Sequence, residues 1–431
     1  MPAPSQQSDE EYDDIVKFLY GLERFGILLG LENIGTLLDR IGNPQLSFPV
    51  VHVAGSNGKG STSSFVSRIL REAGFTTALY TSPHLNDFRE RIRLNGALVS
   101  KEAVIESAKK VREVYDPGRT TFFEFTTAVA FDCIAKERPD MAVIETGLGG
   151  RLDATNTTKP RVTVITDISR EHEDYLGKGI ASVAREKAGI VKERVPLITG
   201  AARSDARRVI YDVAAGCGSP VREFGRDFRG IRTGPELFTY QSPRRTLERL
   251  KPPRPLNCQM KNASLAIAVI EELVDQGFTI PEEAIRRGIE HGAFPGRFET
   301  LRQAPCVLID GAHTPEGMRL FKSAFRTLYP GVRPLMLLGL LKDKNYDTLA
   351  RIIAPAAREI VCVRPQSDRS LDPEVLAAMV ETMGIPVRTA PGIVEGFHGL
   401  LEQAAPDDVV VAVGSLYMIG PVRRACGAAD G

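Results

Sequence analysis

The chain has 431 residues, of which 43% are hydrophobic and 25% charged, and its formal net charge is +1. This length predicts two or three domains with well-buried cores. The near-neutral charge argues against a nucleic acid as a partner. No apolar run approaches the roughly 20 residues of a membrane span, and the first 14 residues are polar and acidic, so we expect a cytoplasmic protein with no membrane partner.

Six cysteines are spaced singly along the chain, without a CxxC pair. This usage predicts reduced, mostly buried thiols. They are Cys133, Cys217, Cys258, Cys306, Cys362 and Cys426.

The segment Val50–Thr62, VVHVAGSNGKGST, joins an apolar run to a glycine-rich turn and the start of a helix. Its glycines permit a backbone whose N–H groups point at phosphate oxygens, near the positive end of the following helix. Lys59 adds charge for the β- and γ-phosphates, and the hydroxyl of Ser61 or Thr62 can reach a magnesium ion. The alternative is a tight turn with an incidental lysine. Strand, glycines, lysine and helix nevertheless follow the order of a phosphate loop.

The spacing departs from the common phosphate loop, because only two residues separate Gly55 from Gly58 and a glycine separates Lys59 from Ser61. This pattern resembles the nucleotide loop of the Mur-ligase superfamily, whose members activate a carboxylate with ATP and couple it to an amine. The resemblance implies ATP contacts from Ser56, Asn57, Gly58, Lys59, Gly60, Ser61 and Thr62.

Unbroken apolar runs alternate with helix-like stretches in the first half of the chain, as expected of parallel strands covered by helices. Between residues 203 and 255 the sequence becomes rich in arginine and proline, which predicts an irregular region with a few antiparallel strands. We interpret the arginines as a solvated face rather than a binding patch. The predicted strands are Val50–Ala54, Thr77–Tyr80, Met141–Glu145, Val162–Thr166 and Val195–Thr199.

An amphipathic helix is predicted at Asn262–Gln276, and a linker at 294–299 precedes a second alternating series. We therefore expect an α/β protein, with a P-loop parallel-sheet ATPase domain at 1–297 and a smaller Rossmann-like α/β domain at 298–431. The second series comprises strands at Cys306–Asp310, Pro334–Gly339, Ile360–Val363 and Val409–Gly414 and a helix at Glu316–Leu328.

Two polar side chains follow apolar runs, at the edge where parallel sheets bind ligands. Glu145 closes the run 141–144, where its carboxylate can serve a magnesium ion or only cap the next turn. His172 follows the run 162–166 and is either a metal ligand or a structural histidine. From its pattern alone, Lys187 reads as a surface charge on a helix.

Eight motifs follow one another along the chain: AGSNGKGS at 54–61, TSPHLNDFRERIRLNG at 81–96, FFEFTTAVAF at 122–131, ETGLGGRLDATN at 145–156, REKAGI at 185–190, GRFE at 296–299, DGAH at 310–313 and GSLYMIG at 414–420. In this order they resemble the folylpolyglutamate synthase and dihydrofolate synthase family, the folate branch of the Mur ligases. TSPHL and GLGGRLDATN are the most specific to that branch.

The resemblance implies an ATP- and pterin-binding first domain and a glutamate-ligase second domain. Ser61, Glu145 and His172 match magnesium ligands of the family. Lys187 matches a lysine carried as a carbamate that helps to hold a second metal ion, and a monovalent cation is a further expectation. Carbamylation needs the neutral amine, so the pKa of Lys187 must lie below its ordinary value of about 10.4. Catalysis would fall to Lys59, Lys187 and His172.

Other matched positions imply contacts to the organic ligands. Those that would reach ATP from outside the loop are Asn262, Arg297, Asp310 and His313. Those that would line the pterin pocket are Ile27, Leu28, Leu29, Pro83, Thr121, Phe122, Phe123, Glu124, Leu152, Asp153 and Ala154. In that pocket Phe122 and Phe123 either meet a flat heterocycle or only pack the core, and Glu124 can accept a hydrogen bond from its amino group.

Three residues depart from the family's pattern. Cys258 stands where a histidine is usual, Thr314 replaces the asparagine after DGAH, and Glu171 replaces the aspartate before the metal histidine. The first two affect positions near ATP, and none removes a group that the chemistry must have.

The resemblance implies ATP-dependent ligation of L-glutamate to dihydropteroate, to a reduced folate or to both, through an acyl phosphate. We expect small-molecule substrates and a monomer, with the second domain closing over ATP. Two alternatives stay open: a Mur-type ligase acting on another acid, and a nucleotide-binding regulator without turnover.

Overall fold

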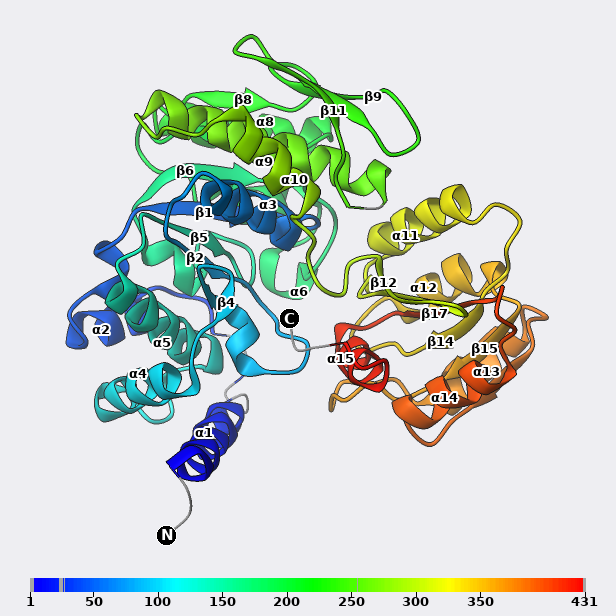
Figure 1. Cartoon of the computed structure of the whole chain (residues 1–431). Helices are drawn as coiled ribbons and strands as arrows, with labels where there is room; N and C mark the ends of the chain where they lie inside the picture. Colours follow the sequence, from blue (N-terminus) through cyan, green and yellow to red (C-terminus); the bar gives the residue numbers. More distant parts are fainter. Residues whose placement is uncertain (1–3, 23–25, 27, 254, 429–431) are drawn as a thin grey trace. The chain divides into compact units, whose positions relative to one another are not determined.

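The computed structural model describes residues 4–22, 26, 28–253 and 255–428, and it divides into two compact units (Figure 1). The first unit comprises Met1–His84 and Phe88–Ala293, and the second comprises Leu85–Asp87 and Phe294–Gly431. The chain therefore passes between the units at three places rather than at one linker.

The first unit is built on an eight-stranded sheet. Its strands are β1 (Val50–Ala54), β2 (Thr77–Tyr80), β3 (Ile92–Leu94), β4 (Ala97–Leu98), β5 (Met141–Glu145), β6 (Pro160–Ile165), β7 (Leu197–Thr199) and β8 (Val221–Glu223). They lie in the order β4-β3-β2-β5-β1-β6-β7-β8. The neighbouring pairs β2–β3 and β3–β4 are antiparallel, and the other pairs are parallel. The five strands predicted from apolar runs are confirmed, the last with a later start.

Helices cover both faces of this sheet, which explains why its central strands are apolar at every position. They are α1 (Pro4–Gly21), α2 (Glu32–Arg40), η2 (Pro44–Leu46), α3 (Lys59–Glu72), η3 (Phe88–Arg91), α4 (Lys101–Val114), α5 (Phe122–Glu137), η4 (Ala154–Thr157), α6 (Glu173–Leu176), α7 (Ile180–Ala188), α8 (Ser204–Gly216), α9 (Leu256–Asp275) and α10 (Glu282–Glu290). The α/β class is confirmed.

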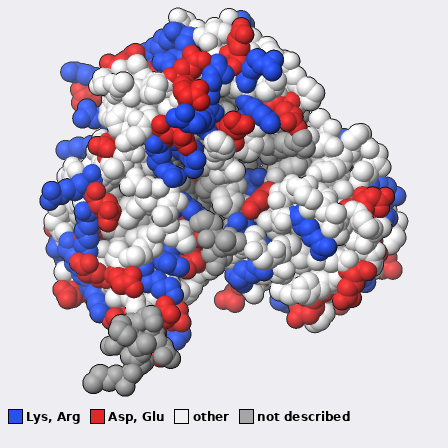
Figure 2. Space-filling model, viewed as in Figure 1, with Lys and Arg blue, Asp and Glu red and all other residues white. Residues whose placement is uncertain are grey.

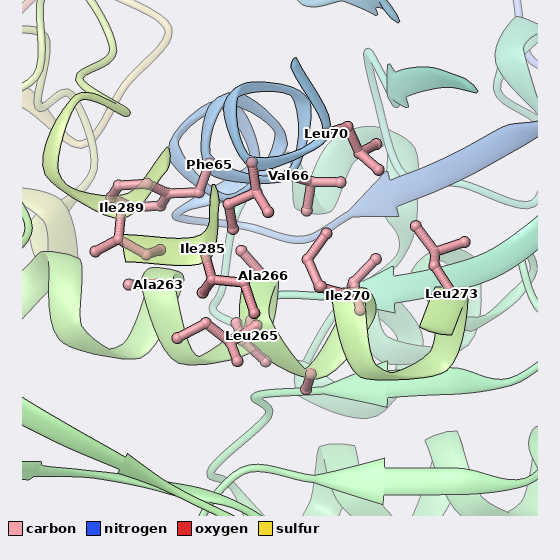
Figure 3. Close-up of a cluster of buried hydrophobic side chains, with 14 of the residues drawn as sticks. Phe65, Val66, Leu70, Ala263, Leu265, Ala266, Ile270, Leu273, Ile285 and Ile289 are labelled. Atoms are coloured by element: carbon pink, nitrogen blue, oxygen red, sulfur yellow. The ribbon is translucent and has the colours of Figure 1, made fainter. Parts of the chain in front are cut away.

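Alternate residues of the central strands pack into different cores. Val51 and Val53 join α3, α9 and α10 on one face, whereas Val50 joins α1, α2, α4 and α5 on the other. Figure 3 shows the first of these cores, where Phe65 of α3 lies over Ala263 of α9 and Ile289 of α10. The phosphate-loop helix is thus held between the sheet and two later helices.

The region 203–255 is more regular than the sequence predicts. It contains α8, the parallel strand β8, and an antiparallel sheet of β9 (Arg229–Arg232), β10 (Phe238–Gln241) and β11 (Thr246–Leu250). The antiparallel strands are confirmed, but the prediction of an otherwise irregular segment is wrong, because α8 buries a narrow apolar stripe that includes Val209 and Ile210.

Several arginines of this region form ion pairs. Arg222 of β8 contacts the fully buried Glu271 at 2.6 Å, which joins the large sheet to α9, and Arg244, between β10 and β11, contacts Glu272 at 2.7 Å, which joins the small sheet to α9. Acidic and basic side chains are interleaved on the face seen in Figure 2. Some of these arginines therefore have a packing role and are not only a solvated face.

The second unit contains a six-stranded sheet. Its elements are β12 (Glu299–Gln303), β13 (Cys306–Asp310), α11 (Pro315–Leu328), β14 (Leu335–Leu338), α12 (Tyr346–Ile353), η5 (Ala354–Ala356), β15 (Glu359–Cys362), α13 (Pro373–Glu381), β16 (Val387–Thr389), α14 (Ile393–Gln403), β17 (Val409–Val413) and α15 (Leu416–Ala425). The order is β12-β13-β17-β14-β15-β16, and only β12 is antiparallel to its neighbour. The four predicted strands and the helix are confirmed.

Among the described residues, five cysteines are free thiols, but only Cys133 and Cys362 are buried. The prediction of mostly buried thiols is therefore wrong for the other three, which are partly exposed. The side chain of Cys258 lies outside the described part of the structure. No helix in the described part of the chain is long and apolar enough to cross a membrane.

The contact between α10 and α3 requires a glycine at position 288. A Cβ there would lie 2.6 Å from the Cα of Ile69, within backbone that cannot move aside easily. We predict that Gly288→Ala lowers the free energy of unfolding by about 1–3 kcal/mol, as overpacking does, despite alanine's better helix propensity. Urea unfolding followed by circular dichroism measures this.

Gly35→Ala in α2 is the matched control, because nothing lies within 4 Å of a Cβ at that position. Its stability should stay unchanged or rise by up to about 1 kcal/mol. Equal stability of the two variants would contradict the close packing described here.

Candidate active site

The glycine-rich turn after β1 leads directly into α3. Gly58 is the N-terminal cap of that helix with φ 85°, and Gly55 has φ 151°. A side chain at Gly55 would collide with the hydroxyl of Thr166, and one at Gly58 would collide with the amide of Asn262. Both glycines are needed for close approach, and Asn262, a predicted ATP contact, lies against the loop.

The chain after β6 braces this loop. Thr166 Oγ1 donates to Asn57 O at 2.7 Å, Ser56 N donates to Asp167 O at 2.9 Å, and Ser169 N donates to Ser56 Oγ at 2.9 Å. The loop shape therefore depends on a segment more than a hundred residues away in sequence. Nothing in the local motif reveals these braces.

Two ammonium groups meet at the carbonyl of Gly55. Lys59 Nζ donates to this oxygen at 2.8 Å and Lys187 Nζ donates at 3.0 Å. Lys187 is 2% exposed and forms an ion pair of 2.7 Å with Glu171. The interpretation of Lys187 as a surface charge is wrong, because its side chain is buried.

Charge pairing decides the protonation of this group. Burial alone raises the pKa of Glu171, but attraction to Lys187 and Lys59 outweighs it, so the pKa falls to about 2. Burial lowers the pKa of Lys187, and attraction to Glu171 only partly offsets this. Glu171, which departs from the family's aspartate, is thus the carboxylate partner of Lys187.

The predicted magnesium ligands lie at the carboxyl edge of the sheet. Ser61 is buried in the first turn of α3, Glu145 ends β5 with 4% exposure, and His172 caps α6 with φ 49°. Since β5 and β6 flank β1, their ends open beside the phosphate loop. The described residues contain no group of three or more His, Cys, Asp or Glu side chains that could hold a metal ion.

The donor set nevertheless fits a cation held jointly with phosphate oxygens. Thr62 Oγ1 and Thr146 Oγ1 are buried, and neither has a hydrogen-bond partner within the described part of the chain. Buried hydroxyls of this kind usually find a partner. Both flank a predicted ligand, Ser61 or Glu145, and the side-chain oxygens of those two residues are of the kind that Mg²⁺ takes together with phosphate oxygens.

Asp310, predicted to reach ATP, organises two turns of the second unit. Its carboxylate accepts from Phe298 N at 2.8 Å and from Ala312 N at 2.7 Å. Burial raises its pKa, against the attraction of Arg297. His313 Nδ1 lies 2.8 Å from Gly311 O, so that nitrogen carries the proton.

The departure at position 314 has a structural explanation. Thr314 caps α11 and accepts from Gly317 N at 3.1 Å. Threonine does this nearly as well as asparagine, so the substitution leaves the helix start intact.

The sequence did not indicate that Glu299 holds the turn that carries Arg297. Glu299 Oε2 accepts from Gly296 N at 2.7 Å, while Oε1 pairs with the buried Arg423 at 3.2 Å. Glu299 is the last residue of GRFE, and Arg423 lies in α15, so only the fold shows that they meet.

The predicted pterin-pocket residues have several structural roles. Thr121 and Glu124 form a capping box at the start of α5, with Glu124 Oε2 accepting from Thr121 N at 2.8 Å. Phe123 lies against Gly147, where a Cβ would collide with its ring. Leu28 and Leu29 are exposed by 49% and 40%.

Five further predicted positions belong to that set. Pro83 is exposed after a cis peptide bond, Leu152 is half-buried, Ala154 is buried, and Ile27 lies outside the described residues. Asp153 is buried and accepts from Leu148 N at 2.7 Å and Thr155 N at 3.0 Å. Burial raises its pKa.

Comparison with known proteins decides the family. The sequence matches the Mur ligase middle domain over residues 53–225 and the Mur ligase, glutamate ligase domain over residues 296–416. The dihydrofolate synthase/folylpolyglutamate synthase of Bacillus subtilis is 32% identical over 426 residues, covering 96% of this chain and 98% of that protein. The chain belongs to the folylpolyglutamate synthase/dihydrofolate synthase family.

Solved structures of family members are similar throughout. The structure of E. coli FolC in complex with DHPP and ADP has a TM-score of 0.88 at 29% identity, covering 97% of this chain and 98% of that chain. A bifunctional folylpolyglutamate synthase/dihydrofolate synthase with Mn, AMPPNP and L-glutamate bound has a TM-score of 0.85 at 28% identity, with coverage of 96% and 98%.

Some relatives are longer. A probable bifunctional folylpolyglutamate synthase/dihydropteroate synthase of Haloferax volcanii is 33% identical over 428 residues, and the chain spans 50% of its length. The likeness therefore concerns the part of that protein that this chain covers.

A buried polar chain links the phosphate-loop strand to the LDATN motif of this family member. His52, in β1, lies with Nε2 2.8 Å from Thr155 Oγ1, which donates to Asp153 Oδ1 at 2.5 Å. Since the threonine proton goes to the carboxylate, His52 Nε2 must be the donor to Thr155. Burial, reinforced by repulsion from Lys192, lowers the pKa of His52 to about 3.

Neutral His52 makes stability depend on pH. Between pH 6.5 and about 3 the unfolded chain takes up a proton at this histidine and the folded chain does not, so stability falls as pH falls. From pH 7.5 to 5.0 we expect His52 to contribute a loss of about 2 kcal/mol.

Urea unfolding of the native protein and of His52→Gln at both pH values isolates this effect. Glutamine can still donate to Thr155 but does not titrate. The variant's loss should be smaller by about 2 kcal/mol. Equal losses in the two proteins would show that His52 is not kept neutral by the fold.

Proposed function

We propose that this protein ligates L-glutamate to a pteroyl-type carboxylate with hydrolysis of ATP, through an acyl phosphate. The observation that carries the proposal is the convergence of Lys59 and Lys187 on the Gly55 carbonyl, at the N-terminus of α3. Lys59 keeps its positive charge when Lys187 is carbamylated, and a cation at a helix N-terminus forms a site for a polyanion. The ligands bound to the related structures, ADP with DHPP and AMPPNP with L-glutamate, support the same reaction.

The loop would bind the triphosphate through the N–H groups of residues 56–62. Lys59 would turn from the Gly55 carbonyl to the phosphate oxygens and neutralise charge as the substrate carboxylate attacks the γ-phosphate and ADP departs. The amine of glutamate then attacks the acyl carbon, phosphate leaves, and the amine gives up a proton. Most of the catalysis is positioning and electrostatics.

Ser61, Glu145 and His172 would hold Mg²⁺, and Lys187 as a carbamate would help to hold a second ion. Bound divalent ions would supply charge neutralisation at the phosphates. A monovalent cation is a further expectation for this site. The Mn ion in a related structure supports a divalent metal in the family.

Residues of the second unit would complete the nucleotide site. We assign ATP contacts to Arg297 and His313, with Asp310 and Glu299 holding the turns that carry them. Asn262 would contact the nucleotide from α9. This division of labour requires the second unit to close over ATP during the reaction.

The acid substrate would bind against Phe122 and Phe123, with Leu28 and Leu29 as further apolar contacts. Glu124 and Asp153 would act mainly by holding the pocket walls, since their carboxylates accept backbone N–H bonds. Whether dihydropteroate, reduced folates or both are substrates is the finer part of this proposal. Free thiols in the described part of the chain fit a cytoplasmic protein, which we expect to act as a monomer.

Phosphate release with dihydropteroate, L-glutamate and ATP, followed by mass measurement of the product, tests the reaction. We predict that Lys59→Ala lowers the rate at least about 100-fold, because charge at the phosphates goes uncompensated. The exposed Lys159 offers a control, and Lys159→Ala should keep the native rate. Full activity of Lys59→Ala would refute the phosphate-loop assignment.

The same assay separates the alternatives. Release with another acid but not with dihydropteroate or a reduced folate would identify a different Mur-type ligase. ATP binding without release under any acceptor would identify a regulator.

Carbamylation of Lys187 has its own test. The reaction joins the neutral amine to CO₂ and releases a proton, and the resulting anion would lie beside Glu171, so a cation is needed between them. We predict a carbamate carbon signal by NMR in ¹³C-bicarbonate when Mg²⁺ and AMPPNP are present. Lys187→Arg, which cannot be carbamylated, is the control. Identical spectra for the two proteins would exclude the modification.

A further inference from the structure

Tyr20, at the C-terminal end of α1, lies outside every motif that carries the family resemblance, and it forms an aromatic and cationic cluster with residues of two of those motifs. Tyr20 stacks on Phe122, the first residue of α5, with ring planes 8° apart and centroids 6.0 Å apart. The guanidinium of Arg91 lies 5.3 Å from the centroid of Phe122. His84 joins the two, with one ring nitrogen toward each of Tyr20 and Arg91.

Hydrogen-bond chemistry fixes the direction of this relay. Arg91 Nε donates to His84 Nδ1 at 2.8 Å, and an arginine nitrogen can only donate. His84 Nδ1 is therefore an acceptor, so the proton lies on Nε2 and is given to Tyr20 Oη at 2.8 Å. The Tyr20 oxygen therefore accepts a hydrogen bond from the His84 ring, and the hydroxyl proton of Tyr20 points away from His84.

Ordinary core packing does not explain the place of Tyr20. The core face of α1 consists of Tyr12, Ile15 and Leu19, which are 5%, 4% and 1% exposed. Tyr20 is 44% exposed, yet its hydroxyl is fixed through His84 to Arg91, which is only 6% exposed. The mostly buried Arg91 thus orients, through His84, the partly exposed ring of Tyr20.

We propose that Tyr20 is a specificity-determining residue that extends the Phe122 surface and contacts the flat aromatic part of the acid substrate. The inference rests on the proposed function, because it takes Phe122 to line the acid pocket. His84 and Arg91 are positioning residues that hold the ring in place. Flat ring systems favour offset stacking on aromatic side chains, so a fixed ring gives affinity without ordering a flexible one.

Steady-state kinetics of Tyr20 variants separates the contribution of the aromatic ring from that of the hydroxyl. Tyr20→Leu should raise the KM for dihydropteroate about 3- to 10-fold while the KM for ATP and kcat change less than twofold. Tyr20→Phe keeps the ring and should raise that KM less than Tyr20→Leu does. His84→Ala should raise it through loss of orientation, and His84→Gln, which can accept and donate, should restore it.

Tyr211 provides a matched control in the same unit. Its hydroxyl donates to Glu223 at 2.8 Å and Arg226 lies 5.2 Å from its ring, but it belongs to α8, beside β8 at the other end of the sheet. Tyr211→Leu should leave all three kinetic constants within twofold of the native values. Equal effects of the two leucine variants, or an unchanged KM in Tyr20→Leu, would overturn the proposal.

A binding measurement tests the contact without turnover. The chain contains no tryptophan, so Tyr20→Trp introduces a single indole at the proposed contact. Addition of dihydropteroate with Mg²⁺ and ADP should shift its emission to shorter wavelength as the ligand displaces water, whereas the emission maximum of Tyr211→Trp should not move. Saturable binding without a shift at position 20 would refute the contact. Absence of acid-dependent phosphate release by the native protein would instead refute the proposed function.

Discussion

The carbonyl oxygen of Gly55 is the point on which this site depends. Two ammonium groups, from Lys59 and Lys187, donate to it, and the carboxylate of Glu171 pairs with Lys187 at 2.7 Å. While Lys187 is unmodified, like charges held this close in a poorly solvated place repel one another, so the arrangement favours an anion beside them. The helix N-terminus adds to that preference. In the proposed function, this positive charge would preorganise the loop for phosphate before nucleotide binds.

Buried carboxylates build the loops around this point. Asp153, Asp310 and Glu124 were expected to touch ligands, and each accepts a hydrogen bond from a backbone N–H group of its own turn. A carboxylate that satisfies two or three backbone donors fixes a loop that has no regular hydrogen bonding. The sequence motifs therefore contain loop-forming residues as well as contact residues, and a motif alone cannot separate the two roles.

The sequence predicted the elements whose signals are local. β1, β2 and β5 are covered on both faces, so each reads as an unbroken apolar run. α8 was missed because its apolar stripe runs between arginines. Lys187 was misread because a lysine on a short helix gives no sign that it points inward, and the Tyr20 relay joins residues 20, 84, 91 and 122, which only folding brings together. A local sequence pattern predicts single helices and strands, whereas contacts between residues far apart in sequence are seen only in the folded structure.

The segment Leu85–Asp87 gives the two units a second covalent connection besides the one at residues 293–294. It packs with the second unit, where Leu85 joins the core beside Ile419 and Asn86 accepts from Arg424. Its neighbours His84 and Phe88 belong to the first unit and to the aromatic cluster around Tyr20. Any displacement of the second unit is transmitted through peptide bonds to both residues. The closure proposed for the second unit would thereby be coupled by covalent structure to the residues that orient Tyr20, and a hinge at residues 293–294 alone would be insufficient for it.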